Sequence, residues 1–288
     1  MLIWQALTAG ILLGGVYAAI AIGLGLVWGV MKILNIAHAA LALLGAYLTV
    51  TLMQSAGIDP LASLVISVPV LFALGALTQR LFVSPLIGRR DFETQTFLML
   101  YGIMVVVENL SVFFWKTDVR LISPSYANHV ILLAGAVLPV GRLIAFGLGT
   151  GTVAVVYLFL RRSRLGLAVR ALGFDREAAG IVGINVGSVS MLAFGIGTAT
   201  AAVAGVCLGL VSSFFPGLQI VWISKAFLIV VLGGIGNIPG LLLAAITLGV
   251  LESVVGVLAP AYVSNLVAYV LLIVVLMVRP QGLLGSKI

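Results

Sequence analysis

Residues 1–31 carry no charged side chain, and almost all of them are apolar. A signal peptide would begin with a basic segment and would have a shorter apolar stretch, so this run is not typical of one. A helix needs about 20 apolar residues to cross the hydrocarbon core of a bilayer. We therefore expect the chain to begin with a membrane-spanning helix.

Further apolar runs follow along the chain, which is 62% hydrophobic and only 8% charged. Runs long enough to span a membrane lie at 5–28, 34–53, 61–80, 95–115, 142–160, 187–211, 239–258 and 263–279. A shorter run at 224–236, which either crosses fully or re-enters, is separated from the seventh span by glycines and a proline. The sequence thus predicts one all-α domain over 1–288, a transmembrane bundle of about eight spans plus one short interrupted helix.

Basic residues cluster between the apolar runs, and the positive-inside rule places such clusters in the cytoplasm. Counting crossings from the cluster at 161–176 puts most of them inside: Lys32, Arg80, Arg89, Arg90, Arg161, Arg162, Arg164, Arg170, Arg176, Arg279 and Lys287. The others fall outside: Lys116, Arg120, Arg142 and Lys225. The net charge of +7 therefore indicates the orientation of the spans in the membrane and does not indicate nucleic-acid binding.

This orientation places the N-terminus outside and the C-terminus in the cytoplasm. The loop at 117–141, in which Pro124 and Pro139 disfavour a helix, is then external, and the segment at 161–185 is cytoplasmic. Small residues four apart, which let helix backbones approach closely, predict tight packing of the spans. These pairs are Gly10/Gly14, Gly25/Gly29 and Gly205/Gly209. The single cysteine, Cys207, lies in an apolar run and excludes an internal disulfide or a cysteine metal site.

Two polar residues, Asn35 and His38, lie where the second span begins. Being three residues apart, they are expected to share a helix face at the cytoplasmic start of that span. Polar side chains inside a membrane are costly and usually face a partner or a cavity. The pair therefore lines a cavity or has a structural role, as an interhelical hydrogen bond or a cap at the helix start.

The segment 170–185 combines acidic residues, two alanines and a glycine. Acidic residues suit the start of a helix, the alanines keep its surface thin, and the glycine ends it. A short, thin helix in the cytoplasm has a shape that fits a groove on a soluble partner, although a solvated loop would explain the same pattern. The residues expected to form this surface are Asp175, Arg176, Glu177, Ala178, Ala179 and Gly183.

The segment 225–240 joins the short apolar run to a glycine-rich turn that contains Asn237 and Pro239. Glycine-rich turns can bind phosphate, but this spacing is neither a P-loop nor a dinucleotide fingerprint, so we exclude nucleotide binding. A broken helix is tolerated at membrane depth only where protein or a water-filled cavity surrounds it. We expect this break to line a pathway through the bundle.

The order of these three segments along the chain is characteristic of a known family. The segments are NIAH at 35–38, DREAAGIVGIN at 175–185 and KAFLIVVLGGIGNIPG at 225–240. Together they resemble the H-type (LivH-like) permease subunits of branched-chain amino-acid ABC importers, and the resemblance extends from Gly14 to Gly282. Two features depart from the family pattern. The Gly-Glu that follows the histidine in the family is Ala39-Ala40 here, and the Leu-Pro of the general importer motif is absent.

The resemblance implies the ABC importer permease fold and a permease subunit that passes branched-chain or related amino acids from an external binding protein to the cytoplasm. It also implies a bacterial or archaeal plasma (inner) membrane, a second permease, which is M-type or another copy of this chain, and two cytoplasmic ATP-binding subunits. The helix at 177–179 would be the coupling helix that contacts one of them. The chain has no Walker motif, so it is not expected to be an enzyme by itself. No cofactor, metal or nucleic acid is expected, and membrane lipid surrounds the spans.

Four polar residues lie nearest to broken or membrane-entering segments and are expected to line the translocation pathway. They are Asn35, His38, Asn237 and Glu252. Hydrogen bonding between helices explains the same residues, as does pairing with a neighbouring subunit for Glu252.

Three alternatives to this importer follow from the sequence. A secondary transporter usually keeps acidic groups in the membrane, and only Glu108 and Glu252 qualify, both towards span ends. An intramembrane enzyme needs a nucleophile with a base or clustered metal ligands, but His38 and His129 fall in separate regions. The same importer class also includes carriers of urea, amides and aromatic acids.

Overall fold

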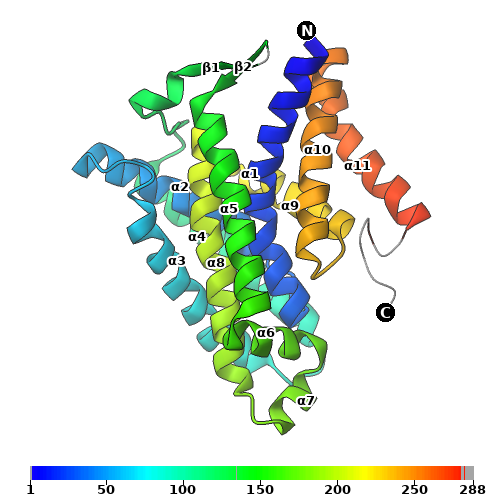
Figure 1. The fold of residues 1–288 in the computed structure, drawn as a ribbon. Helices are drawn as coiled ribbons and strands as arrows, with labels where there is room; N and C mark the ends of the chain where they lie inside the picture. The colour runs from blue at the N-terminus through cyan, green and yellow to red at the C-terminus, as the bar shows by residue number, and fades with distance from the viewer. Residues whose placement is uncertain (1, 134, 280–281, 283–288) are drawn as a thin grey trace.

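The computed structural model describes residues 2–133, 135–279 and 282, most of them in helices (Figure 1). The helices of the candidate membrane spans are α1 (Leu2–Met31), α2 (Ala37–Ala56), α3 (Leu64–Thr78), α4 (Phe92–Trp115), α5 (Val140–Arg162), α8 (Val186–Val211) and α10 (Ile238–Leu258). The others are α6 (Arg164–Phe174), α7 (Arg176–Ile181), α9 (Gln219–Gly233) and α11 (Ala261–Val278). Lys287, which the topology count used, lies outside the described residues, as do Pro280 and Gln281.

Within the described part of the chain, seven helices are long and apolar enough to cross a membrane, and they coincide with the first seven predicted spans. The third is α3 together with a π-helical turn, η1 (Gln79–Val83), and a 3-10 turn, η2 (Ser84–Leu86). The predicted eighth span coincides with α11, whose described apolar stretch, Leu266–Val278, is shorter. The short interrupted helix is α9. The polytopic helical bundle is therefore confirmed.

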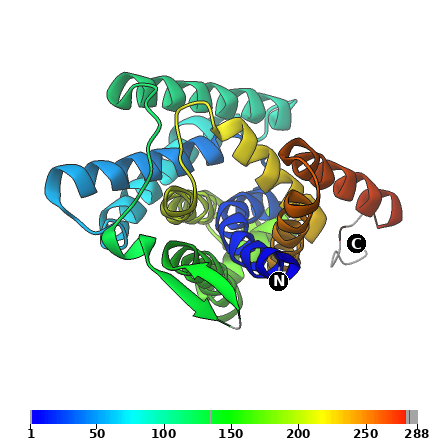
Figure 2. The ribbon, with the colours of Figure 1, turned by 90° about the horizontal axis from the view of Figure 1, so that it is seen from above.

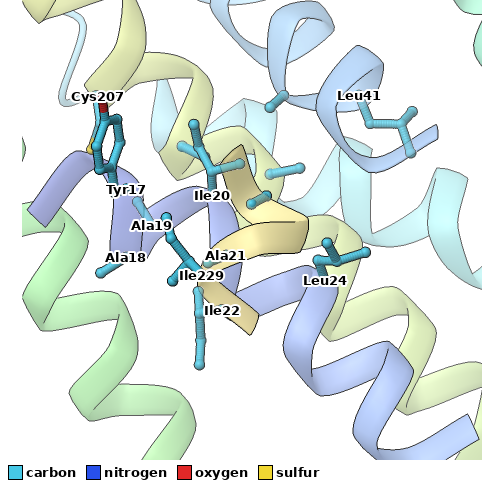
Figure 3. Packing of buried hydrophobic residues seen from close by; sticks show 14 of the residues in the cluster. Tyr17, Ala18, Ala19, Ile20, Ala21, Ile22, Leu24, Leu41, Cys207 and Ile229 are labelled. Carbon is cyan, nitrogen blue, oxygen red and sulfur yellow. The ribbon is translucent and has the colours of Figure 1, made fainter. Parts of the chain in front are cut away.

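Helix α1 lies at the centre of this bundle, with α5, α8 and α10 packed around it (Figures 1 and 2). Most of its residues are buried, and Tyr17, Ile20 and Leu24 contribute to the main hydrophobic core. In Figure 3, Cys207 of α8 and Ile229 of α9 lie beside this part of α1. A helix that is buried on all sides must be apolar all round, which explains why residues 1–31 lack charge.

Glycines set how closely the neighbouring helices approach. A Cβ atom added at Gly10 or Gly14 of α1 would lie 2.5 or 2.6 Å from a backbone Cα atom of α10. A Cβ atom at Gly205 of α8 would lie 2.1 Å from the carbonyl oxygen of Ala42 in α2. Gly10, Gly14 and Gly205 of the predicted pairs therefore mark sites where one helix backbone touches another, whereas Gly209 packs against the side chain of Ile122.

Helix α2 begins beside the middle of α1 and not at its end. After Met31 the connection turns back along α1, and Nε2 of His38 lies 3.0 Å from the carbonyl oxygen of Ile20. Ile20 precedes Met31 by about three turns of helix, or roughly 16 Å along the axis. The prediction that Asn35 and His38 share a helix face at the cytoplasmic start of the span is wrong, because Asn35 precedes α2 and the helix starts deeper in the bundle.

The predicted loop at 117–141 contains a short hairpin that the sequence analysis missed. Its elements are the 3-10 turn η3 (Ser125–Asn128) and the antiparallel strands β1 (Val130–Leu133) and β2 (Ala136–Pro139). The side-chain amide of Gln5 donates to the carbonyl oxygen of Val137 and accepts from its N–H, both at 2.8 Å. These two bonds hold the hairpin against the first turns of α1. Strands of four residues carry too little alternation to be recognised in sequence.

Candidate functional site

The short helix α7 forms as its sequence predicts. Oδ1 of Asp175 accepts hydrogen bonds from the backbone N–H groups of Glu177 (2.9 Å) and Ala178 (3.0 Å), so Asp175 is the N-cap. The chain leaves the helix through Gly183, whose φ of +87° favours glycine. Helices α6 and α7 lie at the end of the bundle where α5 ends (Figure 1).

The surface of this segment is more apolar than the sequence suggested. Phe174, at the end of α6, is 94% exposed, and Ile181 and Val182 at the end of α7 are 87% and 74% exposed. Large exposed apolar side chains that gather in one segment are typical of a surface that contacts another protein or the membrane. The sequence signal was present for Phe174, which directly precedes the charged residues 175–177, but only the alanines were considered.

The two alanines of α7 differ in their surroundings. Ala178 is exposed, as predicted, whereas Ala179 is buried and does not contribute to the outer surface. Nη2 of Arg176 donates to Oγ of Ser190 in α8 at 3.3 Å. Arg176 and Ala179 therefore attach α7 to the bundle, while Glu177 and Ala178 face outward.

Asn35 and His38 are both fully buried. The interaction of His38 with Ile20 is the interhelical hydrogen bond that the sequence left open as an alternative. Gly23 makes room for the imidazole, because a Cβ atom there would lie 2.4 Å from Cε1 of His38. The side-chain amide of Asn35 has no hydrogen-bond partner among the described residues, and α2 is not capped by it. A buried unpaired amide in a native structure requires a functional or structural explanation.

The break between α9 and α10 lies against the end of α1. Gly234 and Gly236 have φ values of +93° and +80°, which turn the chain. Oδ1 of Asn237 accepts from the N–H of Gly240 at 2.9 Å and so caps α10. A Cβ atom at Gly29 of α1 would lie 2.7 Å from Cα of Gly236. Asn237 also lines an open cavity of about 780 Å³ between the ends of α1, α5 and α6.

Lys225 and Glu252 form an ion pair inside the bundle that the sequence analysis did not predict. Nζ of Lys225 in α9 lies 2.9 Å from Oε2 of Glu252 in α10, and the side chains are 17% and 6% exposed. The Tyr17 hydroxyl of α1 accepts from Lys225 at 2.8 Å and donates to Glu252. The ammonium group also lies 5.9 Å from the ring centroid of Trp222. This pair joins three helices and compensates two charges that would be costly alone in a membrane.

The ion pair changes the interpretation of Lys225. Lys225 was counted with the external charges, but it lies inside α9 and is neutralised there, so it carries no information on sidedness.

The predicted pathway residues occupy three places, which are the start of α2, the break and the ion pair. Ile20 and Tyr17, the partners of His38 and Glu252, are one turn apart on α1. Among the described residues, no group of three or more His, Cys, Asp or Glu side chains could hold a metal ion.

Comparison with known proteins identifies relatives along the whole chain. Residues 6–276 match the family described as branched-chain amino acid transport system / permease component. The chain is 32% identical over 294 residues to the high-affinity branched-chain amino acid transport system permease protein BraD of Pseudomonas aeruginosa, covering 98% of this chain and 95% of that protein. It is 32% identical over 301 residues, with the same coverage, to the permease protein LivH of Escherichia coli K12.

A ribose import permease protein, RbsC of Haemophilus influenzae, is 24% identical over 76% of this chain and 69% of that protein. Among solved structures, PsaBC from Streptococcus pneumoniae in complex with Fab superimposes with a TM-score of 0.51 and 14% identity, covering 96% of this chain and 92% of that one. This likeness concerns the fold alone and agrees with a permease bundle. The chain belongs to the family of permease components of branched-chain amino acid transport systems.

Proposed function

We propose that the chain is the membrane-spanning permease subunit of an ATP-driven importer for branched-chain or closely related amino acids. The observation that carries the proposal is the capped helix α7 with its exposed apolar neighbours, at one end of the bundle. A permease needs an energy source, and this segment has the size and surface that fit a groove on a soluble ATPase. The names of BraD and LivH support branched-chain amino acids as cargo.

The ATPase contact would use the six residues that the sequence singled out, in different roles. Glu177 and Ala178 would touch the ATPase, together with Ile181. Asp175 and Gly183 would fix the two ends of α7, since they cap it and turn the chain away from it. Arg176 and Ala179 would transmit movement to the bundle, because they are the residues that attach α7 to it.

The proposed contact between α7 and the ATPase also sets the orientation of the chain in the membrane. The segment 161–185 would be cytoplasmic, the hairpin segment at 117–141 external, the N-terminus outside and the C-terminus inside, in a plasma (inner) membrane. Two ATP-binding subunits, an external binding protein and a second permease subunit would complete the transporter. The hairpin lies at the end of the bundle opposite α7, where a binding protein would dock (Figure 1).

The translocation pathway would use Asn35, His38 and Glu252 within the membrane, while Asn237 would contribute through the break that it caps. A zwitterionic cargo needs transient polar partners, because an unpaired polar group in apolar surroundings costs about 2–7 kcal/mol. The unpaired amide of Asn35 is the group that best fits this role. Few such groups are needed, because an importer must release its cargo.

Reconstitution tests the proposed function. Proteoliposomes that contain the chain, the second permease and the ATPases, supplied with the binding protein, are expected to take up leucine only when ATP is present on the ATPase side. Uptake that follows a proton or sodium gradient without ATP would overturn the importer in favour of a secondary transporter. Uptake of urea, an amide or an aromatic acid in place of leucine would keep the importer and change its cargo.

A further inference from the structure

The open cavity of about 780 Å³ lies where several segments of the bundle end together. Its walls come from the last turns of α1 and α5, from α6, and from the break that precedes α10. Because α1, α5 and α10 are long and apolar enough to span a membrane, their ends mark the depth at which the hydrocarbon meets the aqueous phase. The cavity therefore lies at the membrane boundary.

The charge of the cavity is of one sign. Arg161 of α5 and Arg170 of α6 line it, and its described lining residues include no acidic side chain. Arg161 is held by Tyr157, whose hydroxyl accepts from Nη1 at 2.8 Å and whose ring centroid lies 5.8 Å from the guanidinium carbon. Two guanidinium groups without a carboxylate attract the carboxylate of a zwitterionic amino acid but repel its ammonium group. The lining therefore favours an anion over the transported cargo.

The remaining wall of the cavity is largely apolar. Residues of this kind include Leu26, Val30, Leu160, Val231 and Ile238. Helix α6 also exposes Leu165 and Leu167 beside its arginines, a pattern typical of a helix that lies in the membrane interface. A small inorganic anion would leave the apolar wall in contact with water, whereas an anionic amphiphile would cover it.

We propose that this cavity binds an anionic phospholipid, with its phosphate group on Arg161 and Arg170 and an acyl chain along the apolar wall. Basic pockets between transmembrane helices suit such headgroups. Gly173 of α6 packs against α1, since a Cβ atom there would lie 3.0 Å from the carbonyl oxygen of Gly29. A lipid in the cavity would thus join α6, which leads into α7, to the break before α10. The proposal does not depend on the transport function, because lipid binding is measured without transport.

Native mass spectrometry of the full-length protein, purified with its copurifying subunits, tests the site. The probes are phosphatidylglycerol and phosphatidylcholine with the same acyl chains. Arg161→Gln/Arg170→Gln removes the two lining guanidinium groups, while Arg162→Gln/Arg164→Gln removes two exposed arginines that are not among the lining residues. We expect the first variant to bind phosphatidylglycerol about 30-fold more weakly, and the control variant to bind it as the wild type does.

Equal binding of phosphatidylglycerol by the two double variants overturns the proposal. Equal binding of phosphatidylcholine and phosphatidylglycerol by the wild type does so as well. Displacement of phosphatidylglycerol by millimolar inorganic phosphate would identify a site for a free anion and not for a lipid. Should Arg161→Gln/Arg170→Gln fail to assemble, the single variants carry the comparison, each with an expected loss of about fivefold.

Discussion

At the scale of single residues, Asn35 and His38 are equally buried but differ in what their side chains bind. His38 has a hydrogen-bond partner in Ile20, whereas the amide of Asn35 has none among the described residues. Removing a satisfied hydrogen bond costs about 0.5–1.5 kcal/mol, while removing an unsatisfied polar group has no such cost. The same substitution should therefore affect the two positions differently.

We expect Asn35→Ala to leave the melting temperature of the detergent-solubilised protein unchanged or higher, and His38→Ala to lower it. Because Asn35 is proposed to contact the cargo, ATP-dependent leucine uptake by Asn35→Ala should fall while its amount in the membrane stays normal. Thr49→Ala, which removes the buried hydrogen bond between Oγ1 of Thr49 and Oγ of Ser63 at 3.0 Å, is the control for loss of stability at a residue outside the proposed pathway. A stable Asn35→Ala variant that transports at the normal rate would remove this residue from the pathway.

The ion pair of Lys225 and Glu252 makes a second residue-scale prediction. Lys225→Met leaves a buried carboxylate without its partner, and Glu252→Gln leaves a buried ammonium group. Each change should lower the free energy of unfolding by about 3–5 kcal/mol, because it creates a lone charge in the bundle. The double variant removes both charges and should cost less than either single change. Thermal unfolding in detergent measures this, and a double variant as unstable as the sum of the two would contradict the pairing.

At the scale of elements, α7 is only six residues long and cannot persist without its attachments. The Asp175 cap and the bond from the Ile184 N–H to the Ala179 carbonyl oxygen, at 3.0 Å, hold its two ends. Glu177 lies on its outer side. The helix therefore has a fixed shape and an outward residue that can be changed without altering that shape.

Glu177→Ala should change the free energy of unfolding by no more than about 0.5 kcal/mol, because the side chain is exposed. Glu177→Arg should reduce both uptake and cargo-stimulated ATP hydrolysis, since it reverses the charge at the proposed ATPase contact. Glu93→Arg, which reverses an exposed acidic residue in the first turn of α4, is the matched control. Normal uptake by Glu177→Arg would count decisively against the coupling role of α7.

At the scale of the whole molecule, the segments proposed to lie on opposite sides of the membrane are the hairpin segment and α7. Ser123→Cys and Ala178→Cys place exposed thiols on each of them. The natural Cys207 is buried, so its background reaction is low. A membrane-impermeant thiol reagent added to intact cells should label Ser123→Cys, and should label Ala178→Cys only after the membrane is opened. The reverse result would invert the orientation.

Helix positions could be predicted from the sequence because apolar length is a local property, and α8 was expected at 187–211 and observed at Val186–Val211. The depth at which α2 starts could not be predicted from the sequence, because it depends on a turn after Met31 and on a contact between His38 and Ile20. The ion pair was missed for the same reason, since Lys225 and Glu252 are distant in sequence and meet only when α9 packs on α10. The start of α7 at Asp175 could be predicted because it depends on residues that are close together in the sequence.

The central position of α1 has a consequence for biosynthesis. The ribosome makes this helix before α10, yet the glycines at positions 10 and 14 of α1 pack against α10. At about 5–20 residues per second, roughly 10–50 s pass between the synthesis of the two helices. During that time the surface of α1 that will become the core faces lipid or the insertion machinery. A chain that stops before α10 therefore leaves its future core unpaired, which gives membrane quality control a feature to recognise.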